Sequence, residues 1–145
     1  MTNSPRALEN ILYTATATAI AGRNGRVTSD DGKLDLEVST PKSLGGSGVG
    51  TNPEQMFAAG YAACFGSALG HIARAQKITT GPVHVTAKVA LGSLSGGVYG
   101  LAVELVTAIP ELPREQAEAL VKAAHESCPY SNATRGNIVV DVRLA

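Results

Sequence analysis

Residues 52–76, NPEQMFAAGYAACFGSALGHIARAQ, contain the features that decide the fold. Asn52 suits the N-cap of a helix, Pro53 suits the first helical position, and Gln55 stands where a capping box requires it. The residues that follow are apolar on almost every face, which is typical of a helix buried all round. We therefore expect a helix that ends near residues 74–77. Because no run of about eighteen apolar residues exists, we interpret the segment as a core helix and expect no membrane span.

The same helix carries small residues at every fourth position on one side, namely Ala59, Ala63 and Ser67. Small side chains let another helix approach closely along that side. The helix is about 30 Å long, and a chain of 145 residues has difficulty enclosing it. Charged residues are also few, at 17% against about 25% in an average domain. These features predict a homodimer in which a second copy covers the helix.

Length and composition exclude several classes of protein. A chain of 145 residues corresponds to one domain, so we expect a single domain over residues 1–145. Twelve Lys and Arg residues balance twelve Asp and Glu residues, whereas a nucleic-acid-binding protein usually has a clustered basic excess. Two cysteines without a CxxC motif exclude a disulfide scaffold and a zinc ribbon. Residues 11–21 loosely mimic a secretory signal, but threonine at every second position favours a strand, so we expect a cytoplasmic protein.

The rest of the chain alternates between strand and helix patterns. Apolar residues at every second position, with turn signals such as Asn24-Gly25 and Asp31-Gly32, predict strands. Apolar residues at helical spacing after Pro113 predict a second helix, which Pro129 ends. The order βββ-α-ββ-α-β defines an α+β domain that opens with an antiparallel meander. The strands are expected at residues 10–20, between the two turns, and at residues 34–40, 82–93, 98–109 and 138–144.

The two cysteines, Cys64 and Cys128, lie on the core faces of the two helices and leave three interpretations open. Free cysteine is among the most buried residue types, so both can be structural. Alternatively they form a redox pair, whose disulfide would contribute about 4 kcal/mol in the chain-entropy model. A metal site is the third interpretation, but His71 lies about 10 Å from Cys64 along the helix, too far for one zinc ion. We expect no metal site, and we expect His125 to be a solvated helix residue.

Three segments resemble the signatures of a known family. Residues 52–65 are similar to the first-cysteine signature of the organic hydroperoxide resistance proteins in the OsmC/Ohr family. Residues 128–138, CPYSNATRGNI, look like their second-cysteine signature, in a form closer to Ohr than to the OsmC branch. Residues 12–25 look like the N-terminal signature of the same proteins. The resemblance covers the chain from about residue 10 to its end.

This resemblance implies a cysteine-based peroxidase that reduces organic hydroperoxides to alcohols. It assigns the peroxidatic role to Cys64 and the resolving role to Cys128, through an intramolecular disulfide, and it adds Arg23 and Glu54 to the catalytic site. The implied fold is OsmC-like, with antiparallel sheets around two central helices in an intertwined homodimer whose active sites lie at the subunit interface. The implied reductant is a dihydrolipoyl group on a lipoylated protein, and no cofactor is implied. Two alternatives remain: an OsmC-type peroxidase with other reductant and substrate preferences, and a dimeric binding module with incidental cysteines.

The residues around Cys64 require a cation that spacing alone does not identify. Cys64 stands about twelve residues into its helix, whereas the helix dipole acts only in the first turn. Apolar neighbours raise the pKa of a thiol by desolvation. A positive charge must therefore be supplied, and the resemblance selects Arg23 among twelve Lys and Arg residues. The apolar surroundings are expected to favour organic hydroperoxides over hydrogen peroxide, and the candidate lining residues are Phe57, Tyr61, Phe65 and Tyr130.

Glu54 is expected to hold Arg23 by a charge-assisted hydrogen bond. It stands ten residues before Cys64, so the two lie about 15 Å apart along a straight helix. One guanidinium group that contacts both can bridge only about 8–10 Å. Two arrangements therefore remain open. Either the helix breaks near Gly60, or Glu54 reaches the site from the partner subunit.

Overall fold

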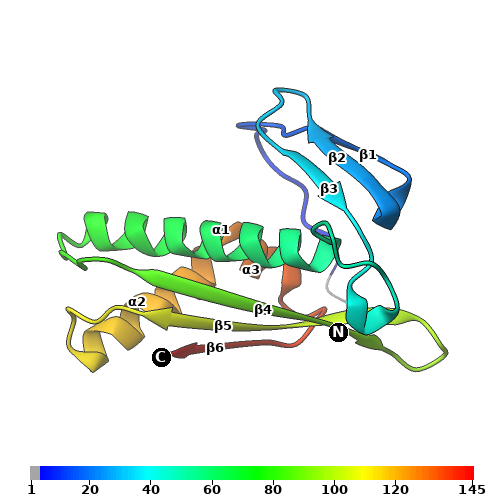
Figure 1. The fold of residues 1–145 in the computed structure, drawn as a ribbon. Helices are drawn as coiled ribbons and strands as arrows, with labels where there is room; N and C mark the ends of the chain where they lie inside the picture. Colours follow the sequence, from blue (N-terminus) through cyan, green and yellow to red (C-terminus); the bar gives the residue numbers. More distant parts are fainter. Residues whose placement is uncertain (1–3) are drawn as a thin grey trace. The chain divides into compact units, whose positions relative to one another are not determined.

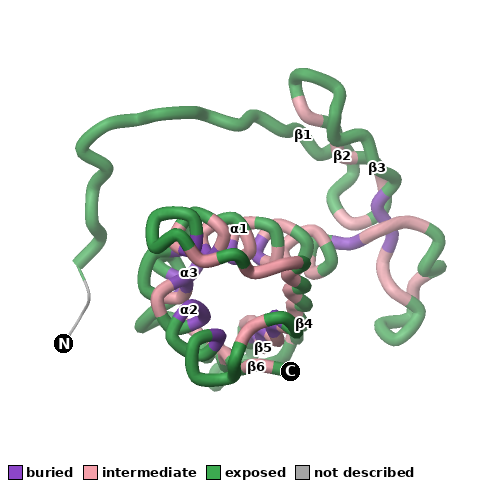
Figure 2. Tube along the Cα trace, turned by 90° about the vertical axis from the view of Figure 1, so that its left-hand side faces the viewer, coloured by how far each residue is buried: buried purple, intermediate pink, exposed green. Residues whose placement is uncertain are grey.

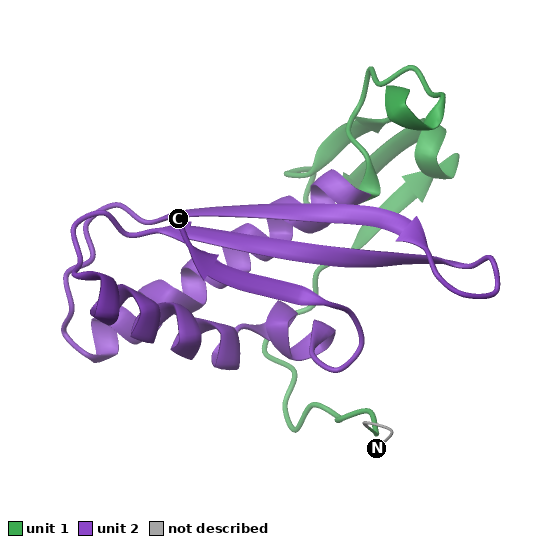
Figure 3. Ribbon diagram, turned by 90° about the horizontal axis from the view of Figure 1, so that it is seen from below, with its two compact units in different colours: residues 1–53 green, residues 54–145 purple. Residues whose placement is uncertain are grey.

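The computed structural model describes residues 4–145, which form two compact units (Figure 3). The first unit ends at Pro53, and the second comprises Glu54–Ala145. Each unit has its own three-stranded sheet. Both cysteines belong to the second unit, whereas Arg23 belongs to the first. The organisation of residues 1–145 as a single domain stays a prediction.

The first unit is an antiparallel sheet of β1 (Ala17–Ile20), β2 (Gly25–Ser29) and β3 (Asp35–Val38) in that order (Figure 1). In its register Val27 lies between Ala19 and Leu36. The predicted meander and the turn between β2 and β3 are therefore confirmed. A short 3-10 helix, η2 (Lys42–Leu44), lies within the predicted loop after β3.

The first strand is shorter than the alternating pattern of residues 10–20 predicts. Strand geometry is confined to Ala17–Ile20, the residues that pair with β2. A strand needs a neighbouring strand to satisfy its N–H and C=O groups, so the pattern alone does not form one. Leu12 and Tyr13, which precede the strand, are 96% and 80% exposed. An apolar segment this exposed is the kind of surface that another chain covers.

Arg23 lies in the tight turn between β1 and β2. The turn contains a 3-10 helix, η1 (Gly22–Asn24). Ala21 and Gly22 take the left-handed conformation, with φ of 59° and 54°, which is uncommon for alanine. A side chain at Gly25 would collide with the preceding backbone. The predicted turn is therefore present, but its tightest part comes earlier in the sequence than predicted.

The second unit contains three helices and a sheet, with one helix more than predicted. Its first helix begins at the predicted proline and ends within the predicted range. The additional helix exists because Pro129 ends one helix and also occupies the first position of the next, where its missing N–H has no cost. The elements are α1 (Pro53–Ala75), β4 (His84–Ser93), β5 (Tyr99–Ala108), α2 (Arg114–Ser127), α3 (Pro129–Thr134) and β6 (Val140–Leu144).

The sheet of the second unit has the strand order β4-β5-β6. β4 and β5 are antiparallel, but β5 and β6 are parallel, with Val103 opposite Val140. The α+β class is confirmed, and the prediction of antiparallel pairing is wrong for β6. The reason is the connection, because the chain passes through α2 and α3 between β5 and β6. A helical crossover returns the next strand in the same direction.

The core of the second unit lies between one face of this sheet and the helices (Figure 2). The opposite face of the sheet is charged, with Lys88 Nζ and Arg143 Nη2 at 2.9 and 2.8 Å from the Glu104 carboxylate. A sheet with one apolar and one polar face is expected when helices cover only one side. The buried core residues of α1, β5 and α2 include Tyr61, Phe65, Leu69, Ala73, Val103, Leu105, Ala117, Leu120, Val121 and Ala124.

Among residues 4–145, α1 is the one helix that matches a membrane span by length and composition. Only one of its sides is buried in this chain, since the small residues Ala59, Ala63 and Ser67 on another side are exposed. The expectation of a helix buried all round is therefore not met within a single chain. An apolar helix with one uncovered side retains surface that a second copy can bury.

Phe65→Ala should lower the free energy of unfolding by about 3–5 kcal/mol, because it removes a fully buried ring and leaves a cavity. Lys122→Ala, on the exposed side of α2, is the control and should change it by less than about 0.5 kcal/mol. Urea unfolding of both variants at one protein concentration measures the difference. Equal effects of the two substitutions would contradict the placement of Phe65 in the core.

Candidate active site

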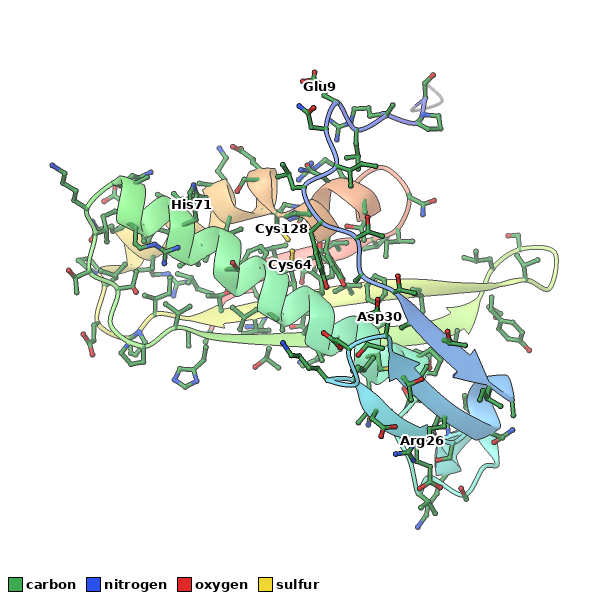
Figure 4. All side chains as sticks on the ribbon, turned by 90° about the horizontal axis from the view of Figure 1, so that it is seen from above. Glu9, Arg26, Asp30, Cys64, His71 and Cys128 are labelled. Atoms are coloured by element: carbon green, nitrogen blue, oxygen red, sulfur yellow. The ribbon has the colours of Figure 1, made fainter. Side chains whose placement is uncertain are left out.

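Cys64 and Cys128 come together in the second unit (Figure 4). Their Sγ atoms are 3.6 Å apart, and both thiols are free. Cys128 is buried and Cys64 is half-buried, so only one of the two sulfurs retains access to solvent. A disulfide needs the sulfurs about 2 Å apart, which is within reach of side-chain movement. Of the three interpretations, the contact favours a redox pair.

The turn between α2 and α3 directs Cys128 toward α1. The Cys128 N–H still donates to the Ala124 carbonyl at 2.8 Å, but its ψ of 127° takes the chain out of the helix. Pro129 then starts α3, and the Cys128 carbonyl accepts the N–H of Asn132 at 2.9 Å. Cys128 is thus both the C-cap of α2 and the N-cap of α3. These two bonds fix the backbone of Cys128 at the point where α2 ends and α3 begins.

Burial raises the pKa of the Cys64 thiol. The backbone N–H of Tyr130 lowers it again in part, because it donates to the sulfur, whereas the neighbouring Cys128 raises it further. Within this unit the protonated thiol is therefore favoured over the thiolate. A nucleophilic Cys64 needs a positive charge from outside these contacts.

Three aromatic rings contact one another beside the turn. The ring centroids of Phe57, Tyr61 and Tyr130 are 5.5–6.1 Å apart. Gly60 makes this approach possible, because a Cβ there would lie only 2.8 Å from the Tyr130 hydroxyl oxygen. Tyr61 and Phe65 have no exposed surface, whereas Tyr130 is 38% exposed. The role of the four residues in substrate binding stays a prediction.

A buried polar chain, which sequence reasoning missed, passes through the same turn. Tyr61 Oη is hydrogen bonded to Ser131 Oγ at 2.9 Å and to Thr134 Oγ1 at 3.2 Å. Ser131 Oγ is also bonded to His125 Nδ1 at 2.9 Å. The expectation of a solvated His125 is therefore wrong. The available signal was spacing, since His125 and Ser131 stand three residues before and after Cys128.

Burial, and after it the charge of Arg135, lowers the pKa of His125. The ring is therefore neutral at neutral pH, with one nitrogen that donates and one that accepts. Among residues 4–145, no group of three or more His, Cys, Asp or Glu side chains could hold a metal ion. His71, the histidine considered with Cys64, is exposed on α1.

The other two predicted site residues are Arg23, which belongs to the first unit, and Glu54, which belongs to the second. Glu54 is half-buried in the first turn of α1, ten residues before Cys64. Because α1 runs without interruption from Pro53 to Ala75, the break near Gly60 is absent. The other arrangement, in which Glu54 comes from the partner subunit, stays a prediction. A site that combines both cysteines with Arg23 and Glu54 stays a prediction.

The fold and the sulfur pair define an α+β protein with a dithiol between two helices of one unit. Residues 45–143 match the OsmC-like protein family. The chain is 51% identical over 139 residues to an organic hydroperoxide resistance protein of Xanthomonas axonopodis pv. citri, which covers 94% of this chain and 97% of that one. It is 49% identical to organic hydroperoxide resistance protein OhrB of Bacillus subtilis, with 92% and 98% covered. The chain therefore belongs to the OsmC/Ohr family, among the organic hydroperoxide resistance proteins, as its motifs predict.

Solved structures agree with this assignment. A putative organic hydroperoxide resistance protein from Vibrio cholerae, with captopril bound in one of its active sites, is 50% identical and superimposes with a TM-score of 0.90 over 94% of each chain. An OsmC-like protein from Mycoplasma pneumoniae is 18% identical with a TM-score of 0.76, over 93% of this chain and 98% of that one. At that identity the likeness concerns the fold alone.

Mild oxidation of the folded protein should join Cys64 to Cys128, because the sulfurs are already in contact. The measurements are intact mass, which falls by two hydrogen atoms per chain, and peptide mapping of the linked cysteines. Cys128→Ser should give no intramolecular bridge and serves as the control. Bridges formed only between chains would contradict the pairing.

Proposed function

We propose that the protein is a cysteine-based peroxidase that reduces organic hydroperoxides to alcohols. The observation that carries this proposal is the 3.6 Å contact between a half-buried Cys64 and a buried Cys128. The names of relatives such as those of Xanthomonas and Bacillus support organic hydroperoxides as the substrate class. The division of access suggests the roles, since only the partly exposed sulfur can meet a substrate first.

In the proposed cycle the Cys64 thiolate attacks one peroxide oxygen. An S–O bond forms, the O–O bond breaks, and the departing alkoxide takes a proton and leaves as the alcohol. Cys128 then attacks the sulfur of the Cys64 sulfenic acid, so that an S–S bond forms and the S–O bond breaks. The Cys128 proton and the released hydroxide leave as water. An external dithiol returns two electrons and two protons and regenerates both thiols.

Arg23 is proposed to supply the positive charge that the buried Cys64 needs. Lowering a thiol pKa from about 8.5 to about 5.5 raises the thiolate fraction at neutral pH about 30-fold, but the nucleophilicity falls about 20-fold. Activation by pKa alone is therefore small. Arg23 acts mainly by orienting the peroxide and by stabilising the charge that develops on the departing oxygen. Glu54 holds the guanidinium group in place.

The proposed reductant is a dihydrolipoyl group carried on a lipoylated protein, as the family resemblance implies. The alternative is an OsmC-type peroxidase with other reductant and substrate preferences. Turnover with dihydrolipoamide and with thioredoxin, compared at equal concentration, separates the two. The proposed location is the cytoplasm, where thiols are kept reduced.

The proposed assembly is a homodimer with shared active sites. Two surfaces support it: the uncovered small residues of α1 and the exposed apolar segment that includes Leu12 and Tyr13. The length of α1 supports shared sites, because Glu54 and Cys64 of one chain lie about 15 Å apart along an unbroken helix. A partner subunit that supplies Glu54 removes this difficulty.

Cys64→Ser should abolish peroxidase activity, because it removes the attacking sulfur. Cys128→Ser should consume about one equivalent of peroxide, then stop without a small thiol and over-oxidise readily, because no second sulfur traps the sulfenic acid. Peroxide consumption in single and multiple turnover measures both effects. An inert Cys128→Ser together with an active Cys64→Ser would reverse the assignment.

Mixed dimers of Cys64→Ser chains with Glu54→Ala chains should regain activity, although each homodimer is inactive or slow. If Glu54 serves the partner's site, one of the two sites in the mixed dimer carries both wild-type residues. The measurement is peroxide turnover of mixed dimers isolated by two different affinity tags and verified by sedimentation. No recovery in verified mixed dimers would contradict the shared site.

A further inference from the structure

The hydrogen bonds around Ser131 form a chain with one consistent direction. The Thr134 hydroxyl donates to the carbonyls of Tyr130 and Ser131 at 3.0 and 3.2 Å. Having one hydrogen, it can only accept from the Tyr61 hydroxyl. Tyr61 then accepts from Ser131, which accepts from the Nδ1–H of His125. The chain begins at His125 and ends on the carbonyl of Tyr130, and this direction satisfies every member.

The segment that carries Cys128 is also closed on itself. Arg135 donates from Nη2 to the carbonyl oxygen of His125 and from Nη1 to Asn132 Oδ1, the latter at 2.7 Å. The carbonyl of His125 is in the last turn of α2, where such groups lack partners within the helix. His125 is therefore bound through its backbone to Arg135 and through its ring to Ser131. Cys128 lies in the middle of the loop that these two contacts close.

A further contact, made by Tyr61, connects this loop to α1 about one turn away from Cys64. Tyr61 stands three residues before Cys64, and its hydroxyl is fully buried against Ser131 and Thr134. The Tyr130 residue on which the chain ends also donates its N–H to the Cys64 sulfur. These hydrogen bonds thus fix the turn that carries Cys128 relative to the helix that carries Cys64.

We propose that Tyr61, Ser131 and His125 are positioning residues that hold Cys128 in reach of Cys64 for formation of the disulfide. The inference rests on the proposed peroxidase function. Among residues 4–145, the side-chain hydrogen bonds of these three residues go to one another and to Thr134 rather than to either sulfur, so they act through the geometry of the turn. Loss of these hydrogen bonds lets the turn that carries Cys128 move away from Cys64. The Cys64 sulfenic acid then has a longer lifetime and is oxidised by a second peroxide more often.

Ser131→Ala is the direct test, because it removes the central hydroxyl. The matched control is Ser127→Ala, which removes a hydroxyl next to Cys128. This hydroxyl donates to the Ala123 carbonyl at 3.0 Å and takes no part in the hydrogen bonds around Ser131. Cumene hydroperoxide is the probe, and acid-quenched samples are analysed for Cys64 sulfenic acid and for the disulfide. We expect Ser131→Ala to slow disulfide formation relative to Cys64 oxidation by about tenfold. Ser127→Ala should leave that ratio unchanged.

Two further variants separate positioning from a general loss of packing. The double variant Tyr61→Phe with Ser131→Ala should slow disulfide formation by less than the product of the two single effects, since members of one network are not additive. His125→Asn should retain most of the rate, because its amide nitrogen can take the place of Nδ1–H, whereas His125→Leu should lose it. Circular dichroism verifies the fold of each variant. If Ser131→Ala does not fold, His125→Leu, at a half-buried position, provides the same comparison.

A redox titration without peroxide tests the positioning independently of the peroxidase function. In a dithiol buffer, a tenfold loss of effective concentration between the two thiols makes the potential of the pair less negative by about 30 mV. An unchanged potential together with an unchanged rate ratio in Ser131→Ala would overturn the inference. A wild-type Cys64 that peroxide does not oxidise, with a shifted potential in Ser131→Ala, would overturn the proposed function and support the positioning.

Discussion

The buried hydroxyl of Tyr61 is the constraint on which the arrangement of the second unit depends. A hydroxyl without a partner in the core costs about 2–7 kcal/mol relative to water, depending on the reference state. Tyr61 has no exposed surface, and its partners Ser131 and Thr134 both lie on α3. α1 therefore cannot slide or rotate against α3 without losing these bonds. Because Cys64 follows one turn later on α1, the same register that satisfies Tyr61 brings Cys64 opposite Cys128.

This packing has a chemical consequence that opposes reactivity. The apolar contacts that bring the sulfurs together also raise the pKa of Cys64, and the helix dipole is too distant to compensate. The two sulfurs are therefore in contact, but their surroundings favour the protonated thiol of Cys64. The proposed peroxidase resolves the conflict by taking the charge from Arg23. In the proposed dimer a second copy covers the exposed side of α1 and also completes the site.

Periodicity and capping residues predict most elements of the fold. The start of α1 follows from Asn52 and Pro53, whose preferences act within one turn of chain. The pattern fails for β1, where alternation covers residues 10–16 although the register paired with β2 starts only at Ala17. It also fails for β6, since strand direction depends on the path of the crossover rather than on the residues of the strand. The proline that predicts the end of α2 equally suits the start of α3, and local preference does not distinguish the two outcomes.

For the candidate site, the sequence by itself determined that two cysteines lie on helical core faces, and its motifs determined the family. Those properties are local, because side-chain periodicity and short signatures are readable within a few turns. Only the tertiary structure decided that the sulfurs touch, that burial raises the pKa of Cys64, and that His125 belongs to a buried chain with Ser131 and Tyr61. The physical reason is that each of these facts joins residues of α1 to residues of the α2–α3 turn. Such contacts depend on how the helices pack on the sheet, and no window of the sequence contains both partners.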